Sequence, residues 1–256
     1  MSEHKSKESD GRDTGMNGPV TYQLKDSIAT IAMDDGKVNA LSLQMLTELN
    51  SALERARSDR AVVVLTGREG VFSAGFDLRV LRAGGPDAAA MLLSGFELAE
   101  RILSFPTPVV IACPGHAIAM GVFLLLSGDY RIGAAGPYRI TANEVALGLT
   151  MPRAAVEICR QRLSPAHFNR AVIIAEPYSP GDAVGAGFLD RVVRASELQD
   201  VARSTATQLA KLDMDAHAAT KLRAREHTLK AVRAAIEADE ADFQTMSRNT
   251  AAAPGT

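Results

Sequence analysis

The chain of 256 residues carries a formal net charge of −2 and is 46% hydrophobic. This length and composition suit one large domain, or a core with a small appendage, and they supply ample apolar surface for a core. The near balance of charge gives no electrostatic argument for binding nucleic acid or an anionic membrane. We therefore expect a globular protein with neither kind of partner.

The cysteines and the apolar runs predict a soluble protein in a reducing, cytoplasmic setting. Cys113 and Cys159 are isolated and flanked by apolar residues, so we expect buried thiols rather than a disulfide framework or a metal site. The longest apolar run, residues 117–126, is too short to cross a bilayer. Residues 1–18 lack the apolar centre of a signal peptide, and together with residues 247–256 they are predicted to be disordered tails.

Strands alternate with helices along residues 19–195, the predicted core domain, which indicates an α/β fold with a largely parallel sheet. A polar turn at residues 25–27 joins two alternating segments into a hairpin, and Ser42 is a suitable N-cap for the helix that follows. The expected elements are strands at 21–24 and 28–33, a helix from 42, a strand at 62–65, a helix over 88–103, a strand at 108–112, an apolar helix after Gly115 and a strand near 139–141. From Pro152 onward the pattern is helical, and residues 196–246 form a C-terminal helical region.

The strand at residues 62–65 leads toward a turn that contains glycine. Its continuous apolar run is typical of a strand covered on both faces. Ser73 and Ala74 are too small to block a ligand, and Gly75 can take φ values that a Cβ forbids, so the bend could aim the Phe76 amide at an anion or a polarised carbonyl. The glycines here lack the dinucleotide-binding spacing and no P-loop lysine follows, so we expect no nucleotide-binding loop.

Four segments of the chain carry a family resemblance. They are 39–42 (NALS), 72–78 (FSAGFDL), 115–121 (GHAIAMG) and 143–149 (NEVALGL). In order and spacing, from about residue 20 to 245, they resemble the crotonase, or enoyl-CoA hydratase/isomerase, superfamily, and they look closest to bacterial, actinobacterial-type members called enoyl-CoA hydratases. The resemblance implies a crotonase spiral of ββα units with a helical C-terminal region. It also implies an acyl-CoA thioester as the substrate, with no separate cofactor and no metal.

The resemblance further implies two backbone amides that hold the thioester oxygen, and these would belong to Phe76 and Met120. Two such donors stabilise a developing enolate, and the loss of one costs about 3 to 4 kcal/mol of transition-state stabilisation. Met120 departs from the family, which usually has glycine at this position. Its side chain could point back into its helix and leave the amide free, or it could narrow the acyl pocket.

The acid/base residues also depart from the family pattern. Hydratases of the family use two glutamates, and the first of them is replaced by Phe123, which cannot transfer a proton. The second matches Glu144, whose apolar neighbours would raise its pKa by desolvation. One carboxylate suffices for a 1,3-proton shift, so we favour isomerase-type chemistry, with slow hydration or non-catalytic acyl-CoA binding as alternatives. Glu97 and Asp77 could be nominated as a second acid, but neither occupies a family catalytic position.

The resemblance implies that CoA contacts two backbone segments and several cations. The implied CoA-binding residues are Lys37, Val38, Ala40, Ser73, Ala74, Leu78 and Lys221. Lys37, Lys221 and Arg68 are the candidates for its phosphates. Because the C-terminal helices of the family cross to neighbouring subunits, residues 196–246 are expected to build a homotrimer or a dimer of trimers.

Three further polar residues have competing interpretations. We expect Asp77 to cap the next helix, because aspartate is a favoured N-cap. His116 has no recognisable nucleophile as a partner, so we expect it to be a hydrogen-bonded structural residue. Arg153 could meet a polar acyl group at the rim of the pocket.

Overall fold

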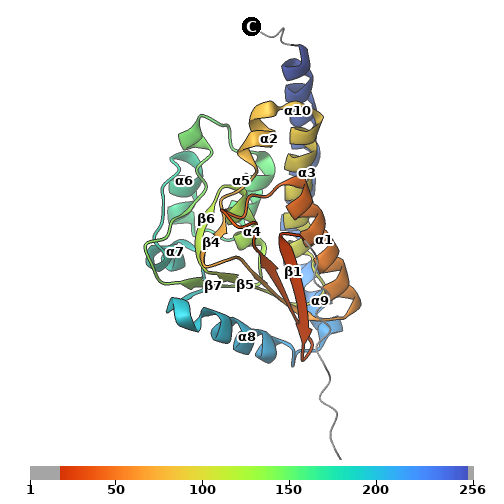
Figure 1. Cartoon of the computed structure of the whole chain (residues 1–256), viewed down its shortest axis with the longest axis vertical. Coiled ribbons are helices and arrows are strands. Elements are labelled where there is room, and N and C mark those ends of the chain that lie inside the picture. The colour runs from red at the N-terminus through yellow and green to blue at the C-terminus, as the bar shows by residue number, and fades with distance from the viewer. Residues whose placement is uncertain (1–17, 253–256) are drawn as a thin grey trace, which may run out of the picture.

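A computed structural model of the protein describes residues 18–252, and Figure 1 shows its central sheet between layers of helices. The larger sheet has the order β1-β2-β3-β5-β7-β9, and a smaller one has the order β4-β6-β8. The strands are β1 (Val20–Lys25), β2 (Ile28–Met33), β3 (Val62–Thr66), β4 (Gly70–Ser73), β5 (Val109–Cys113), β6 (Gly115–Ile118), β7 (Tyr130–Ala134), β8 (Ile140–Thr141) and β9 (Arg191–Val193). Within these sheets every pair except β1–β2 is parallel. The predicted α/β class with a largely parallel sheet is confirmed.

Successive strands alternate between the two sheets and build a spiral. β3, β5 and β7 lie in the larger sheet, and each is followed directly by a strand of the smaller one, β4, β6 or β8. Helices then return the chain to the next pair, since parallel neighbours need a crossover connection. These helices are α1 (Leu43–Ser58), α2 (Leu78–Ala83), α3 (Gly85–Leu103), α4 (Met120–Ser127) and α5 (Arg153–Arg160), with a 3₁₀ turn η1 (Val145–Leu147). The expected spiral of ββα units is confirmed.

The N-terminal hairpin and the first helix form where the sequence predicts them. Asp26 and Ser27 adopt positive φ angles of 52° and 60°, which two-residue hairpin turns favour because their twist matches that of the strands. The Ser42 side chain accepts a hydrogen bond from the Met45 N–H at 3.2 Å and so caps α1.

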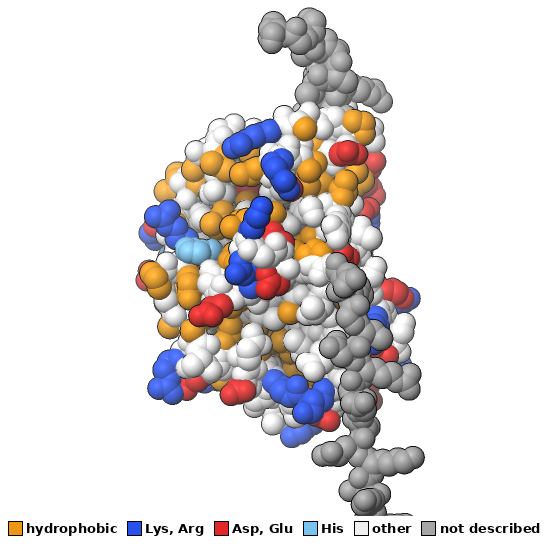
Figure 2. Space-filling view, in the orientation of Figure 1, with side chains coloured by type: hydrophobic (Ala, Val, Ile, Leu, Met, Phe, Trp, Pro, Cys, Tyr) orange, Lys and Arg blue, Asp and Glu red, His pale blue; other side chains and the backbone are white. Residues whose placement is uncertain are grey.

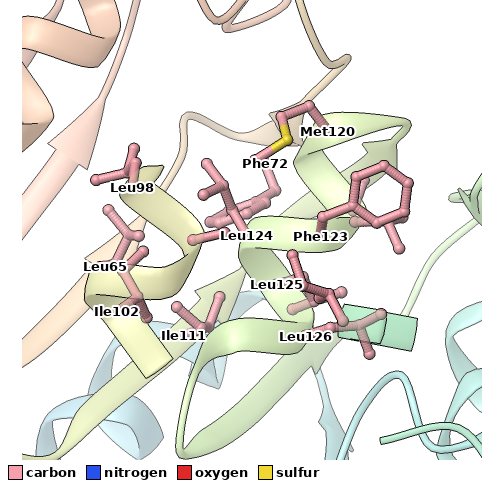
Figure 3. Close-up of a cluster of buried hydrophobic side chains, with 14 of the residues drawn as sticks. Leu65, Phe72, Leu98, Ile102, Ile111, Met120, Phe123, Leu124, Leu125 and Leu126 are labelled. Carbon is pink, nitrogen blue, oxygen red and sulfur yellow. The ribbon is translucent and has the colours of Figure 1, made fainter. Parts of the chain in front are cut away.

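Two hydrophobic layers hold the larger sheet. All five residues of β3 are buried, and alternate side chains point to opposite faces. Leu65 belongs to the layer that contains α1, α3 and α4, and Figure 3 shows it on the side of Leu98 and Ile102 of α3. Val64 belongs to the layer beneath α8 (Leu198–Leu209). The apolar run of β3 therefore reflects helices on both faces of the sheet.

The C-terminal helices cover this framework. They are α6 (Pro165–Ile173), α7 (Pro180–Ala186), the 3₁₀ turn η2 (Ala195–Glu197), α8, α9 (Met214–Ala224) and α10 (Glu226–Ala252). α10 packs along α3 and α5, and its buried Asp239 accepts the N–H groups of Arg153 and Ala154 at 3.0 and 2.9 Å, which caps the start of α5. No helix within residues 18–252 is both long enough and apolar enough to span a membrane.

The C-terminal tail and two short strands differ from the sequence-based predictions. α10 continues through Ala252, so the tail predicted from residue 247 begins as helix. Residues 1–17 and 253–256 lie outside the described part of the chain. β6 precedes the apolar helix expected directly after Gly115, and β9 interrupts the pattern expected to be helical from Pro152 onward. Both strands are short, and β9 has only Val193 buried, so neither produces an apolar run that predicts a strand.

Candidate functional site

Two segments that are distant in sequence lie side by side at the centre of the site. The Leu41 N–H donates to the Gly75 carbonyl at 2.8 Å, and the Ala74 N–H donates to the Val38 carbonyl at 3.0 Å. The buried Ser73 hydroxyl donates to the Asn39 carbonyl at 2.7 Å. These bonds fix residues 37–41 against residues 73–77.

Asn39 and Asp35 shape the first of these segments. Asn39 takes a positive φ of 52°, and its side-chain amide donates to the carbonyls of Met33 and Phe72 at 2.9 and 3.1 Å. The Asp35 carboxylate accepts the backbone N–H groups of Lys37, Asn39 and Ala40 at 2.8 to 2.9 Å. Burial opposes ionisation of this carboxyl, but the three N–H donors, with Arg68 nearby, hold its pKa below the usual value. The loop is thus held by a carboxylate that stays ionised.

Gly75 brings the second segment against the start of α4. Its φ is +91°, and a Cβ added to it would lie 2.9 Å from the Ala119 Cβ and 3.3 Å from the Met120 nitrogen. Such a contact leaves no room for a side chain, so only glycine fits without displacement. The backbone that carries the Phe76 amide therefore closely approaches the backbone that carries the Met120 amide.

Both of these amides are free to bind a ligand. Leu41 bonds to Gly75 and Asp77, the residues on either side of Phe76. Met120 begins α4, and the first N–H groups of a helix have no carbonyl within it. Among residues 18–252 neither N–H has a hydrogen-bond acceptor. Two adjacent donors of this kind can hold an oxyanion.

Ala119 sets the direction of the Met120 amide. This non-glycine residue has φ 51° and ψ −126°, a sparsely populated backbone conformation that is found at functional sites. Its N–H donates to the Thr141 carbonyl at 3.0 Å, and its own carbonyl accepts from Val122 at 2.8 Å, so the bend is held from both sides.

The Met120 side chain turns away from its amide. It is fully buried, and its Cε lies 3.6 Å from the point that a Cβ on Gly95 of α3 would occupy. Figure 3 shows Met120 at the end of α4 together with Phe72 and other core side chains. Of the two orientations left open by the sequence, the structure has the one that packs into the core.

Glu144 enters the site from β8. This strand pairs in parallel with β6, and Thr141 accepts the Ala119 N–H, so Glu144, three residues later, emerges beside the start of α4. The side chain is buried, and within the described part of the chain its Oε2 has no hydrogen-bond partner. Burial raises the pKa of the carboxyl to about 7, although its own backbone N–H partly opposes the rise. A carboxyl with this pKa can both accept and return a proton near neutral pH.

The position that matches the first hydratase glutamate holds Phe123, whose phenyl ring cannot transfer a proton. Phe123 is 1% exposed and stacks on Phe96 at a ring-centroid distance of 6.1 Å, and Phe96 meets the edge of the Phe76 ring, also at 6.1 Å. Of the two other nominated acids, Asp77 caps α2 by accepting the Arg79 N–H at 2.9 Å, as predicted, and Glu97 lies exposed on α3. The region around Phe123 is therefore aromatic and apolar.

The predicted CoA-binding residues lie on the two joined segments or directly after them, except for Lys221, which is described below. Lys37, Val38 and Ala40 lie on the first segment, Ser73 and Ala74 on the second, and Leu78 begins α2 directly after it. Val38 and Leu78 are 50% and 51% exposed, unusual for residues of this type. The Arg68 guanidinium donates to the Lys37 backbone carbonyl at 2.8 Å, which holds this arginine against the first segment. Figure 2 shows hydrophobic side chains gathered on the face that carries α2, α5 and α6.

Comparison with known proteins identifies the family. The sequence profile of enoyl-CoA hydratases and isomerases matches residues 23–254. The chain belongs to the enoyl-CoA hydratase/isomerase family.

The relatives of this family member include proteins named as isomerases and proteins named as hydratases. It is 31% identical over 221 residues to the mitochondrial enoyl-CoA delta isomerase 1 of Homo sapiens, covering 84% of this chain and 73% of the human protein. An enoyl-CoA hydratase structure from Mycobacterium marinum has a TM-score of 0.85 at 48% identity and covers 88% of this chain and all of that one (100%). A Mycobacterium tuberculosis enoyl-CoA isomerase structure has a TM-score of 0.83 at 49% identity, with 87% and 97% covered. The chain is thus an isomerase or lyase of acyl-CoA thioesters.

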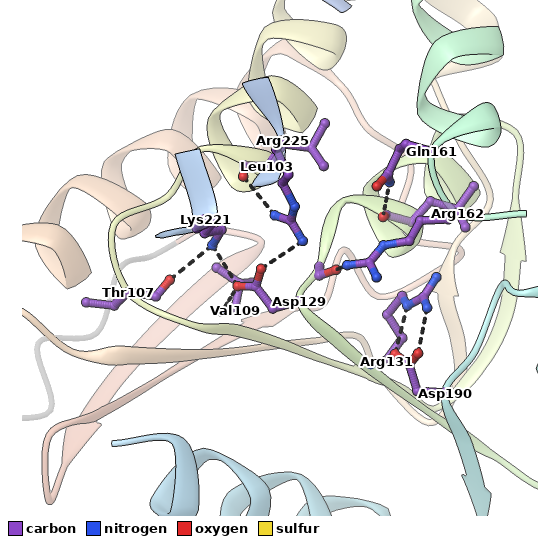
Figure 4. Close-up of polar contacts among 12 residues, drawn as sticks. Leu103, Thr107, Val109, Asp129, Arg131, Gln161, Arg162, Asp190, Lys221 and Arg225 are labelled. Atoms are coloured by element: carbon purple, nitrogen blue, oxygen red, sulfur yellow. Dashed lines mark hydrogen bonds and ion pairs between the residues drawn. The ribbon is translucent and has the colours of Figure 1, made fainter. Parts of the chain in front are cut away.

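Lys221 is the exception among the residues predicted for CoA binding in this family member. It is almost fully buried, and its ammonium group contacts the Asp129 carboxylate at 2.6 Å, where Arg225 also pairs at 2.9 Å (Figure 4). Asp129 also accepts the Val109 N–H at the amino end of β5. α4, about 12 Å long, separates this cluster from Met120. Because its ammonium group is buried and already paired with Asp129, we assign Lys221 to this ion pair rather than to the CoA phosphates.

Two other polar residues have structural partners. Arg153 pairs with Asp239 at 3.1 Å and with Asp242 at 2.5 Å, which ties α5 to α10. His116 accepts the Arg139 N–H at 3.0 Å through Nδ1, in line with the structural role predicted for it. Neither geometry directs a free polar group toward an acyl chain.

Several residues that shape the site have weak sequence signals. Ala119 has none, because alanine rarely adopts a positive φ. Gly95 has a weak signal, because glycine is unfavourable inside a helix and its presence there indicates a close contact. Cys159 of α5 lies close enough for the Glu144 charge to contribute to its raised pKa, after the larger effect of burial, but the two are far apart in sequence.

Proposed function

We propose that the protein moves the double bond of a 3-enoyl-CoA to the 2-position, with Glu144 as the only acid/base. The observation that carries this proposal is the aromatic Phe123 at the position that matches the first hydratase glutamate, together with one buried carboxyl, Glu144, whose pKa is raised. Glu144 takes a proton from C2, and the electrons of that C–H bond form a dienolate whose negative oxygen accepts from the Phe76 and Met120 amides. Protonation at C4 by the same carboxyl then completes the 1,3-shift without a net change in protons.

Hydration makes a different demand on the site. A water molecule must be held and deprotonated, and a single carboxyl beside a phenyl ring offers it only one polar anchor. Phe123 and Phe96 are each 1% exposed, so the ring stack supports a dry environment on this side. Hydratase activity, and acyl-CoA binding without turnover, are the alternative functions.

The rest of the proposal concerns binding and assembly. We infer that the CoA moiety lies along Lys37, Val38, Ala40, Ser73, Ala74 and Leu78, with Lys37 and Arg68 near its phosphates, and that no separate cofactor or metal takes part. The exposed Leu212 and Leu222, each 47% exposed, support a subunit interface formed by residues 196–246 in a homotrimer or dimer of trimers. We also infer a cytoplasmic location.

The test compares wild type with Glu144→Gln on a 3-enoyl-CoA and, separately, on a 2-enoyl-CoA. Isomerisation creates a conjugated thioester and hydration removes one, so the ultraviolet absorbance changes in opposite directions. Wild type is expected to isomerise faster than it hydrates, and Glu144→Gln is expected to lose about a thousandfold in rate. Glu97→Gln, on an exposed position of α3, is the matched control.

Each alternative has its own outcome in this assay. Faster hydration of the 2-enoyl-CoA than isomerisation of the 3-enoyl-CoA would support the hydratase alternative. Thioester binding without turnover of either substrate would support the non-catalytic one.

A further inference from the structure

Gly95 is a buried glycine inside α3, where glycine stabilises a helix less than alanine does. The ring of Phe76 explains its presence. A Cβ on Gly95 would lie 2.4 Å from Cε1 and 2.5 Å from Cζ of that ring. The Phe76 ring therefore rests directly on the bare backbone of α3.

The position of this ring is restricted on most sides. Phe96 packs against the Phe76 ring in a T-shaped arrangement with a ring-centroid distance of 6.1 Å and is itself stacked on Phe123, and the Met120 Cε lies beside Gly95. Phe76 is nevertheless only half-buried. The open side of the ring is thus the side that faces away from α3 and its packed neighbours.

We propose that Gly95 determines acyl specificity by setting the space beside the first carbons of the acyl chain. The inference rests on the proposed function, in which the Phe76 amide holds the thioester oxygen. The ring shares its Cα with that amide and is only half-buried, so a thioester bound at the amide lies within reach of the open side of the ring. With glycine at position 95 the ring stays against α3, and the site admits acyl groups with a methyl branch close to the thioester.

A side chain at position 95 would reverse this arrangement. Ordinary carbon–carbon contacts are about 3.5 Å or longer, so an alanine Cβ would displace the ring by about 1 Å. The ring cannot move toward α3 or through the Phe96–Phe123 stack. It would move into the open side and occupy space that a branched acyl group needs.

The experiment measures binding of two saturated thioesters, butanoyl-CoA and 3-methylbutanoyl-CoA, by calorimetry. The proteins are wild type, Gly95→Ala, Phe76→Leu and the double variant, with Ser94→Ala as a control on the same helix. Gly95→Ala is expected to weaken binding of 3-methylbutanoyl-CoA about tenfold more than that of butanoyl-CoA. Leucine lacks Cε1 and Cζ, the atoms that the new Cβ would meet, so the double variant is expected to show the same ratio as Phe76→Leu alone.

Two results would overturn the inference. In the first, Gly95→Ala weakens the binding of both thioesters equally. In the second, the double variant keeps the binding ratio of Gly95→Ala. Thermal unfolding of every variant identifies misfolded protein, and Phe76→Leu alone, expected to shift the ratio toward the branched thioester, is an independent measurement. Saturated thioesters cannot be isomerised, so these binding ratios are decided separately from the isomerase assay, and either proposal can fail alone.

Discussion

The Ser73 hydroxyl donates to the Asn39 carbonyl at 2.7 Å and accepts the Gly75 N–H at 3.1 Å. One buried side chain thus joins the two segments of the site and supports the turn before Phe76. Ser73→Ala would leave a buried carbonyl and a buried N–H without partners, at a cost of about 1 to 3 kcal/mol. We expect a lower free energy of unfolding in denaturant titrations and a reduced kcat. Ser51→Ala, which removes an exposed hydroxyl from α1, is the control, and equal stability of the two variants would contradict the prediction.

The raised pKa of Glu144 predicts the pH dependence of catalysis. A base must be deprotonated to take the C2 proton, and burial raises the pKa of this carboxyl to about 7. We expect kcat/KM for the isomerisation to rise tenfold per pH unit below about 7 and to level off above it. A rate that stays constant from pH 5 to pH 8 would argue against Glu144 as the base.

The same pKa shift predicts a dependence of stability on pH. The folded protein binds the Glu144 proton more tightly than the unfolded chain does. The protein therefore loses stability as the pH rises from 4.5, the ordinary pKa of the carboxyl, to about 7, its pKa in the folded protein. Glu144→Gln removes that loss. We expect the variant to be more stable than wild type by about 3 kcal/mol at pH 8 and to be nearly equal to it at pH 4. Denaturant titrations at the two pH values test this, and a constant difference would contradict it.

Lys221 and Lys37 offer a matched pair of lysines. Lys221→Ala would leave Asp129 with Arg225 alone in a buried cluster, and breaking such a pair costs about 3 to 5 kcal/mol. We expect a large loss of stability with little change in KM. Lys37→Ala is expected to do the reverse, because Lys37 is exposed beside the inferred CoA phosphates. A raised KM in a folded Lys221→Ala protein would return Lys221 to the CoA site.

Phe123 should contribute to stability through its packing. Replacing this buried ring by alanine leaves a cavity beside Phe96, and such changes cost about 3 to 5 kcal/mol. Phe123→Leu, which keeps more of the volume, is expected to cost less. Thermal unfolding and denaturant titrations measure both, and similar stabilities for wild type and Phe123→Ala would show that the stack is dispensable.

Local signals in the sequence predict the framework of this protein well. The hairpin, the Ser42 cap, the buried strand β3 and the Asp77 cap depend on neighbouring residues, and their patterns are visible in a single sequence. β6 and β9 depend on pairing with distant strands, so short segments with no apolar run become strands only in the folded chain.

The candidate site likewise combines features that local sequence patterns predict with features that depend on distant residues. The motifs around Phe76 and Met120 lie on segments that the structure brings together at Gly75 and Ala119. The Glu144 motif follows β8, which pairs with β6 just before α4. The partner of Lys221 could not be predicted, because a lysine on a polar helix resembles a surface charge until Asp129 is placed beneath it. The relation between Gly95 and Phe76 likewise exists only once α3 lies across the turn.

The strained backbone at Ala119 has a consequence for protein engineering. Because the φ and ψ of Ala119 aim the amide of residue 120, the chemical identity of side chain 120 is separate from its hydrogen-bond donor. Libraries that vary position 120 can therefore alter the packing between α4 and α3 while every member except proline keeps the donor. Searches that require a glycine triplet at this point would overlook sequences that form the same bend with an alanine and a methionine.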